Sequence, residues 1–140
     1  MSNEAWRNAR AMYEKDTCAR TLGIEIIEMD DGYAQMSMTV SSAMLNGHQT
    51  CHGGQLFSLA DTAFAYACNS QGLAAVASGC AIEFIRPAFA GDRLTATAQI
   101  RHQGKQTGVY DIEIVNQQLK TVAFFRGKSH RIGGTITGEA

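Results

Sequence analysis

The sequence carries almost no net charge. Its 12 lysine and arginine residues are balanced by 13 aspartate and glutamate residues, which leaves a net charge of −1 at pH 7. A protein that binds nucleic acid needs a basic face that neutralises phosphates. No such face is expected here, so nucleic acid is not an expected partner.

Cysteine motifs and a secretory leader are also lacking. The cysteines, Cys18, Cys51, Cys68 and Cys80, do not have the C-x-x-C spacing of many metal-binding and redox sites. The first residues do not combine a positively charged segment, an apolar run and a small-residue cleavage site. We therefore expect reduced thiols and a cytoplasmic protein.

A hydrophobic run long enough to cross a membrane is missing as well. The longest apolar stretch, within residues 56–68, is interrupted by Ser58, Asp61 and Thr62, whereas a spanning helix needs about 20 apolar residues. A content of 45% hydrophobic and 18% charged residues is typical of a folded globular protein. We expect one domain over residues 1–140, with a disordered tail from about residue 133.

The pattern of apolar residues predicts one amphipathic helix, two strands, one apolar helix and four further strands. Apolar residues at three- and four-residue spacing predict the first helix over residues 3–20. Alternating segments on either side of the Asp30-Asp31-Gly32 turn predict a hairpin. The second helix is predicted over residues 54–70. The later strands are predicted over residues 76–86, 93–102, 107–115 and 121–131.

The second helix is apolar on nearly every face, as expected for a helix that is surrounded by protein. The simplest packing wraps one antiparallel sheet around it, which is an α+β fold. Most of the other face of the sheet would then be exposed or used for assembly.

Several short motifs resemble a known family. They are Asn46, the run Cys51-His52-Gly53-Gly54, Asp61 and the later Arg86-Pro87. Together with the order of the elements, they resemble the hotdog-fold acyl-CoA thioesterases. The longer run LNGHQTCHGGQLFSLADTAFAYACNSQG is similar to the branch of this family that acts in phenylacetate degradation. The resemblance covers almost the whole chain.

This resemblance implies a hotdog fold and the hydrolysis of aryl-acyl-CoA thioesters, phenylacetyl-CoA or its ring-hydroxylated forms, to the free acid and CoA. It also implies homodimers, paired edge to edge, that assemble into homotetramers. Coenzyme A is then part of the substrate, and no cofactor is expected.

Asp61 is the candidate catalytic carboxylate. An aspartate in a nearly all-apolar helix must be paired, solvated by a cleft or used in chemistry, and its helical neighbours Phe57, Phe64 and Ala65 offer no partner. The resemblance implies that Asp61 attacks the thioester directly or activates a water as general base. The alternative is a structural aspartate that binds a hydroxyl or another backbone segment.

Gly53 and Gly54 are the candidate oxyanion-binding element, because they stand where the apolar helix begins. Unpaired N–H groups and the positive end of the helix dipole can face an oxyanion there, although two glycines also suit a simple tight turn. The resemblance assigns Asn46 to the water or the carbonyl, but asparagine is a common turn former too. His52 assists the oxyanion site or the substrate, or contributes through its backbone alone.

The spacing of Gly53 and Asp61 predicts a site shared between two chains. Eight positions along one helix correspond to about 12 Å along its axis, whereas both groups must lie within roughly 3 to 3.5 Å of the same reacting group. We therefore predict that Gly53 and Asn46 of one chain face Asp61 of a two-fold-related partner.

Other functions remain open. A module that binds acyl-CoA or an acylated carrier protein without catalysis would not need Asp61, and a dehydratase of 3-hydroxyacyl thioesters would use His52 and Asp61 as acid and base. His48, Cys51 and His52 lack a second ligand pair at suitable spacing, so no metal is expected. Aromatic residues near the motif are candidates to line an aryl pocket, but inside helices and strands such residues are expected in the core. Such residues near the motif are Phe64, Tyr66 and Phe84.

Overall fold

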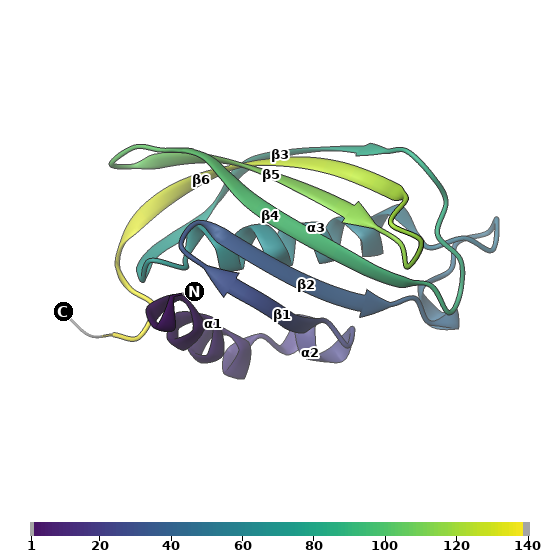
Figure 1. Ribbon diagram of the computed structural model, residues 1–140, viewed down its shortest axis with the longest axis horizontal. Coiled ribbons are helices and arrows are strands. Elements are labelled where there is room, and N and C mark those ends of the chain that lie inside the picture. The colour runs from purple at the N-terminus through teal and green to yellow at the C-terminus, as the bar shows by residue number, and fades with distance from the viewer. Residues whose placement is uncertain (1, 139–140) are drawn as a thin grey trace.

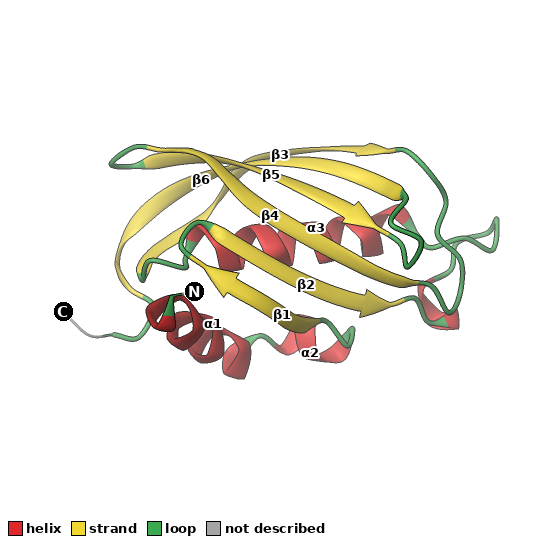
Figure 2. Ribbon diagram, in the orientation of Figure 1, coloured by secondary structure: helices red, strands yellow, loops and turns green. Residues whose placement is uncertain are grey.

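A computed structural model describes residues 2–138. Six antiparallel strands form one sheet in the order β1-β2-β4-β5-β6-β3, and the sheet curves around the long helix α3 (Figures 1 and 2). This confirms the predicted α+β hotdog architecture. In chain order the elements are α1 (Asn3–Lys15), α2 (Thr17–Thr21), β1 (Glu25–Asp30), β2 (Tyr33–Thr39), the 3-10 turn η1 (Ser42–Met44), α3 (Gly53–Cys68), β3 (Leu73–Phe84), β4 (Arg93–Gln103), β5 (Thr107–Val115) and β6 (Thr121–Thr135).

Helix α3 forms the centre of the core, because its apolar side chains pack against the inner face of the sheet. The centroid of the Phe64 ring lies 5.7 Å from that of Tyr110 and 6.0 Å from that of Phe125. Gly127 of β6 allows this approach, since a Cβ atom there would lie 2.7 Å from the Phe64 ring. No helix within residues 2–138 is both long enough and apolar enough to cross a membrane.

The N-terminal helix is divided in two, so the prediction of one helix over residues 3–20 is wrong. Helix α1 ends at Lys15, and Asp16 accepts a hydrogen bond from the Ala19 N–H (3.0 Å) and thereby caps α2. The second Asp16 oxygen accepts a hydrogen bond from the Tyr66 hydroxyl of α3 (3.1 Å). Asp16 thus caps α2 through a local bond, as an aspartate readily does, and is also linked to α3, a contact that spacing along the chain does not reveal.

Strand β3 is a free edge of the sheet. Among the residues that the structure describes it pairs only with β6, and most of its 12 residues are exposed. Leu73 and Val76 are among the exposed apolar side chains, and Glu83 is the one charged residue of the strand. A long, apolar and weakly charged edge is a template for pairing with another strand.

The C-terminal segment is more ordered than predicted. Strand β6 continues to Thr135, which pairs with Leu73, and the Ile136 N–H donates to the Gly72 carbonyl (2.8 Å). The prediction of a disordered tail from residue 133 is therefore wrong for this stretch, because β3 begins before residue 76 and provides it with a partner. Residues 139–140 of the predicted tail lie outside the described residues.

Candidate functional site

The loop before α3 is organised by the side chain of Asn46. Its Oδ1 accepts hydrogen bonds from the backbone N–H groups of His48 (2.9 Å) and Thr50 (3.2 Å), and its Nδ2 donates to the Thr50 hydroxyl (3.0 Å). Within residues 2–138, the second N–H of this amide has no hydrogen-bond acceptor. Asn46 is thus a turn former, as its residue type allows, and also holds one free donor in a fixed position.

His52 caps α3 with its imidazole ring. The Nδ1 atom accepts a hydrogen bond from the Gly54 N–H (2.9 Å), so a neutral His52 carries its proton on Nε2. The prediction that both glycine N–H groups are unpaired is therefore wrong for Gly54, because the capping side chain reaches it. The Gly53 N–H has no partner among the described residues, and it remains available at the positive end of the helix.

A hollow of about 440 Å³ lies beside the Gly53 backbone. Its walls combine the polar groups of the loop with apolar side chains. The Phe84 ring forms one wall, since a Cβ atom on Gly53 would lie 3.0 Å from the tip of this ring. The lining residues are Asn46, Thr50, Cys51, Gly53, Leu56, Phe84, Ile85, Arg86 and Pro87.

Asp61 lies in the middle of α3 and is partly buried. Within the described part of the chain its carboxylate has no hydrogen bond and no ion pair, so nothing there supports the reading of Asp61 as a structural aspartate. Burial raises its pKa above the ordinary value of 3.8. A carboxylate of raised pKa with free oxygens is chemically suited to act as a base or a nucleophile.

The thiols close to these residues stay protonated at neutral pH. Burial raises the pKa of Cys51, which lines the hollow, to about 11. Burial and then the charge of Asp61 raise the pKa of Cys68 to about 12, and the same two causes raise the pKa of Cys80. Because the thiolate is the nucleophilic form, Asp61 is the better candidate for the attacking group.

A single chain does not bring all the candidate residues together. Asn46 and Gly53 line the hollow, and His52 fixes the turn beside it, but Asp61 does not reach this hollow. Asp61 is instead coupled electrostatically to Cys80 on β3. One chain therefore presents two separate halves of a possible site.

The aromatic residues near the motif differ in their environment. Phe64 and Tyr66 are buried in the core, as predicted. The core prediction is wrong for Phe84, whose side chain is 53% exposed and lines the hollow. Phe84 lies beside Gly53, the first residue of α3, so the helix covers only part of its ring.

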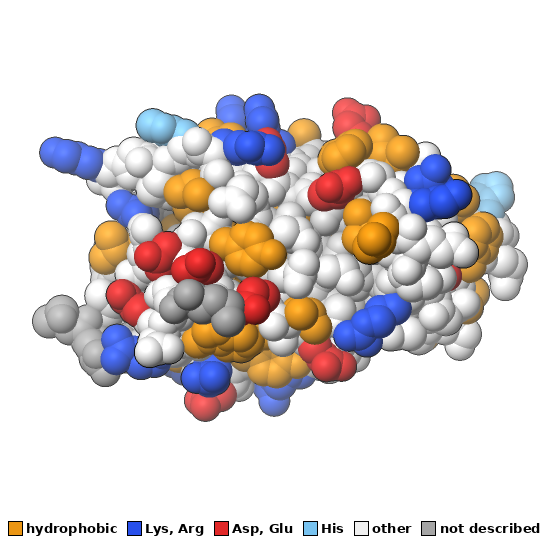
Figure 3. All heavy atoms as spheres, viewed as in Figure 1, with side chains coloured by type: hydrophobic (Ala, Val, Ile, Leu, Met, Phe, Trp, Pro, Cys, Tyr) orange, Lys and Arg blue, Asp and Glu red, His pale blue; other side chains and the backbone are white. Residues whose placement is uncertain are grey.

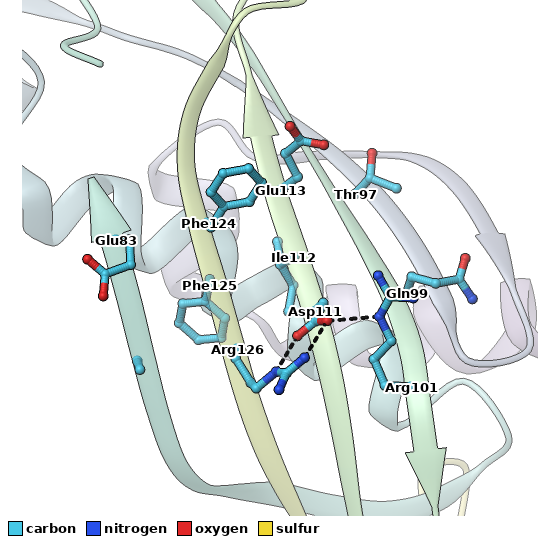
Figure 4. Close-up of a pocket in the computed structure, with 11 residues that line it drawn as sticks. Glu83, Thr97, Gln99, Arg101, Asp111, Ile112, Glu113, Phe124, Phe125 and Arg126 are labelled. Carbon is cyan, nitrogen blue, oxygen red and sulfur yellow. Dashed lines mark hydrogen bonds and ion pairs between the residues drawn. The ribbon is translucent and has the colours of Figure 1, made fainter. Parts of the chain in front are cut away.

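A larger hollow of about 520 Å³ lies on the outer face of the sheet (Figure 4). At its centre Asp111 accepts hydrogen bonds from Arg126 and Arg101, and mainly the bonds from Arg126 lower its pKa. The hollow contains none of the candidate residues, so its size does not make it the centre of the chemistry. Basic and acidic side chains are also intermixed on the face seen in Figure 3.

Metal-ligating side chains do not converge within residues 2–138. No group of at least three His, Cys, Asp or Glu side chains in this range could hold an ion. His48, Cys51 and His52 are neighbours in sequence, but the His52 Nδ1 already accepts the Gly54 N–H.

Comparisons with known proteins identify the family of this chain. Residues 48–123 match the model of the thioesterase superfamily. The chain is 80% identical to the acyl-coenzyme A thioesterase PaaI of Escherichia coli K12 over 140 residues, all of both proteins. A solved structure of the E. coli PaaI protein from the phenylacetic acid degradation operon superposes with a TM-score of 0.95 at 79% identity, covering 96% of this chain and 97% of that chain. A hypothetical thioesterase from Streptococcus pneumoniae, solved with coenzyme A, has a TM-score of 0.76 and 31% identity over 79% of this chain and 86% of its own.

Proposed function

Because this chain belongs to the thioesterase superfamily, we propose that it is an acyl-CoA thioesterase that hydrolyses phenylacetyl-CoA or its ring-hydroxylated forms in phenylacetate degradation. The relative at 80% identity is named an acyl-coenzyme A thioesterase, and its operon is that of phenylacetic acid degradation. The observation that carries the proposal is the unpaired Asp61 carboxylate of raised pKa on the same helix as the unpaired Gly53 N–H. Residues 1–140 form one domain in this proposal.

The proposed reaction places the thioester carbonyl oxygen at the Gly53 N–H. This donor and the helix dipole stabilise the negative charge that develops on the oxygen. As a general base, Asp61 takes a proton from water and the water oxygen attacks the carbonyl carbon. The carbon–sulfur bond then breaks, and the proton held by Asp61 passes to the leaving thiolate, which releases the acid and the CoA thiol. As a nucleophile, Asp61 attacks the carbonyl carbon, the carbon–sulfur bond breaks and the CoA thiolate leaves; water then hydrolyses the resulting mixed anhydride to the acid and restores the Asp61 carboxylate.

We propose that each active site is built by two chains. Asp61 and Gly53 lie about 12 Å apart along α3, and the hollow at Gly53 does not include Asp61. Both halves of the site lie along β3, the free edge of the sheet. Phe84 of this strand lies against Gly53, and Cys80 of the same strand lies near Asp61. A two-fold axis that passes near Ile82, midway between Cys80 and Phe84 on β3, would therefore bring Gly53 of the partner to Asp61 of the first chain.

Edge-to-edge pairing through β3 is the proposed dimer contact. The support is the length, the exposure and the low charge of this edge. Two dimers are proposed to form a homotetramer, for which the outer face of the sheet, with its half-exposed Phe124, is an available surface. With chains of 15.1 kDa, light scattering should give a mass of about 60 kDa for the tetramer.

The proposal includes no cofactor, because Asp61 and the Gly53 N–H supply the two functions that hydrolysis needs. Coenzyme A enters and leaves as part of the substrate and product. All cysteines are free, which supports the proposed cytoplasmic location.

A thiol-release assay tests the proposed function. Phenylacetyl-CoA, a ring-hydroxylated phenylacetyl-CoA, hexanoyl-CoA and palmitoyl-CoA should be compared at equal concentration, with CoA detected by a thiol reagent. We expect release with the aryl-acetyl esters. Binding of these esters without thiol release would instead identify a binding module, and dehydration of a 3-hydroxyacyl-CoA without thiol release would identify a dehydratase.

A further inference from the structure

Phe84 is exposed at a position where an aromatic side chain is normally covered. It is the last residue of β3, and its ring lies on the α3 side of the sheet, against Gly53. Ile82, two residues earlier on the same face, packs against the core. Phe84 lies beside the first residue of α3, so in the single chain the helix covers only part of the ring and 53% of the side chain is exposed, at the end of the β3 edge that is proposed to pair with a partner.

The position of the ring relative to Gly53 is well defined. A Cβ atom built on Gly53 would lie 3.0 Å from Cζ of Phe84 and 3.4 and 3.5 Å from its two Cε atoms. The tip of the ring therefore points at the Gly53 backbone, and the rest of the ring borders the hollow of about 440 Å³. The unpaired Gly53 N–H and this aromatic wall belong to the same small space.

This juxtaposition determines what an acyl group would meet. A carbonyl oxygen that accepts a hydrogen bond from the Gly53 N–H lies about 2.9 Å from that nitrogen. The hollow beside Gly53 is also lined by Phe84, Leu56 and Ile85, so an acyl group held there would meet these apolar walls. Aromatic rings attract each other in offset or edge-to-face pairs at centroid distances of about 4.5 to 7 Å.

We propose that Phe84 is a specificity-determining residue that selects acyl groups with an aromatic ring next to the thioester. The inference rests on the proposed thioesterase function and adds the residue that determines the preference for aromatic acyl groups. Phe84 contacts the acyl group and takes no part in the bond changes.

No other aromatic side chain in residues 2–138 offers the same contact. Phe57 packs against Phe125, at a centroid distance of 5.2 Å. Phe89 and Phe124 are exposed to a similar extent, but neither lines the hollow at Gly53. Phe89 therefore provides a matched control for the loss of an exposed phenylalanine.

The test compares two substrates of nearly the same shape. Phenylacetyl-CoA and cyclohexylacetyl-CoA differ mainly in the π-system of the ring. The ratio of their kcat/KM values isolates the aromatic contact, because oxyanion binding and attack are common to both. This ratio should be measured for the unmodified protein, Phe84→Leu, Phe84→Tyr and Phe89→Leu, with the oligomeric state of each checked by light scattering.

We expect Phe84→Leu to lower the ratio about three- to tenfold, as the loss of one aromatic pair implies, while Phe84→Tyr and Phe89→Leu retain it. An unchanged ratio in Phe84→Leu, or an equal loss for both substrates accompanied by dissociation of the oligomer, would overturn the proposal and assign Phe84 to packing. If the unmodified protein releases no thiol from any ester, the proposed function fails instead, which is a separate result.

Discussion

The substitution Asp61→Asn should lower activity and raise stability at the same time. The Asp61 carboxylate has no hydrogen bond or ion pair among residues 2–138, so an amide of the same shape breaks no contact there. Its raised pKa shows that burial opposes the charged form. Asparagine removes both the reactive carboxylate and this cost of burying a charge.

The loss of activity can be estimated from the role of the group. General base catalysis contributes typically about 10²- to 10⁴-fold, whereas the loss of a nucleophile costs up to about 10⁶-fold in kcat. The neighbouring thiols of raised pKa do not replace the carboxylate. Steady-state hydrolysis of phenylacetyl-CoA should therefore fall by at least about 100-fold, with Asp31→Asn in the exposed hairpin turn as the matched control.

The gain in stability should depend on pH. The folded-state pKa of Asp61 lies above the unfolded value near 3.8, so the folded protein binds more protons between these two values and loses stability as the pH rises through that window. Asp61→Asn removes this loss. Its melting temperature should exceed that of the unmodified protein at pH 7, and the difference should vanish below the unfolded pKa. A variant that is less stable at pH 7, or one that keeps its activity, would refute this reasoning.

Three further substitutions test other parts of the structure. Gly53→Pro should lower kcat about 10²- to 10³-fold, because it removes one oxyanion donor. Proline is tolerated at this first helical position. Gly53→Ala adds a Cβ but keeps the N–H, so it should lose less activity in the same assay. Gly127→Ala should reduce the free energy of unfolding by about 1 to 3 kcal/mol, because its Cβ would lie 2.7 Å from the buried Phe64 ring; a denaturant titration against Gly47→Ala, whose Cβ meets nothing within 4 Å, checks this. Cys51→Ser should keep kcat within a few-fold, since the pKa of about 11 leaves the thiol protonated, and a loss comparable with that of Asp61→Asn would point to a cysteine nucleophile.

Much of the fold follows from patterns that are local in the sequence. The breaks at residues 103–105 and 116–120 predicted β5 with its bounds, and the apolar character of α3 predicted a sheet around it. The features that were missed depend on contacts between distant residues. At the break, Asp16 also accepts a hydrogen bond from the distant Tyr66 hydroxyl, and the end of β6 pairs with the start of β3.

The candidate site was predictable by residue type but not by geometry. An aspartate in an apolar helix is conspicuous in the sequence, as are two glycines at its start. The capture of the Gly54 N–H by the His52 ring depends on one side-chain rotamer. The exposure of Phe84 depends on how far β3 extends beyond the beginning of α3.

The most direct test of the shared site uses mixed dimers. Asp61→Asn and Gly53→Pro chains with different tags should be co-expressed and the mixed dimers isolated, after each parent is shown to be nearly inactive and folded. If Gly53 of one chain works with Asp61 of its partner, one site in every mixed dimer carries both original residues, and the rate of thiol release should return to about half that of the unmodified dimer. Mixed dimers as inactive as their parents would contradict the account, because each chain would then build its own site.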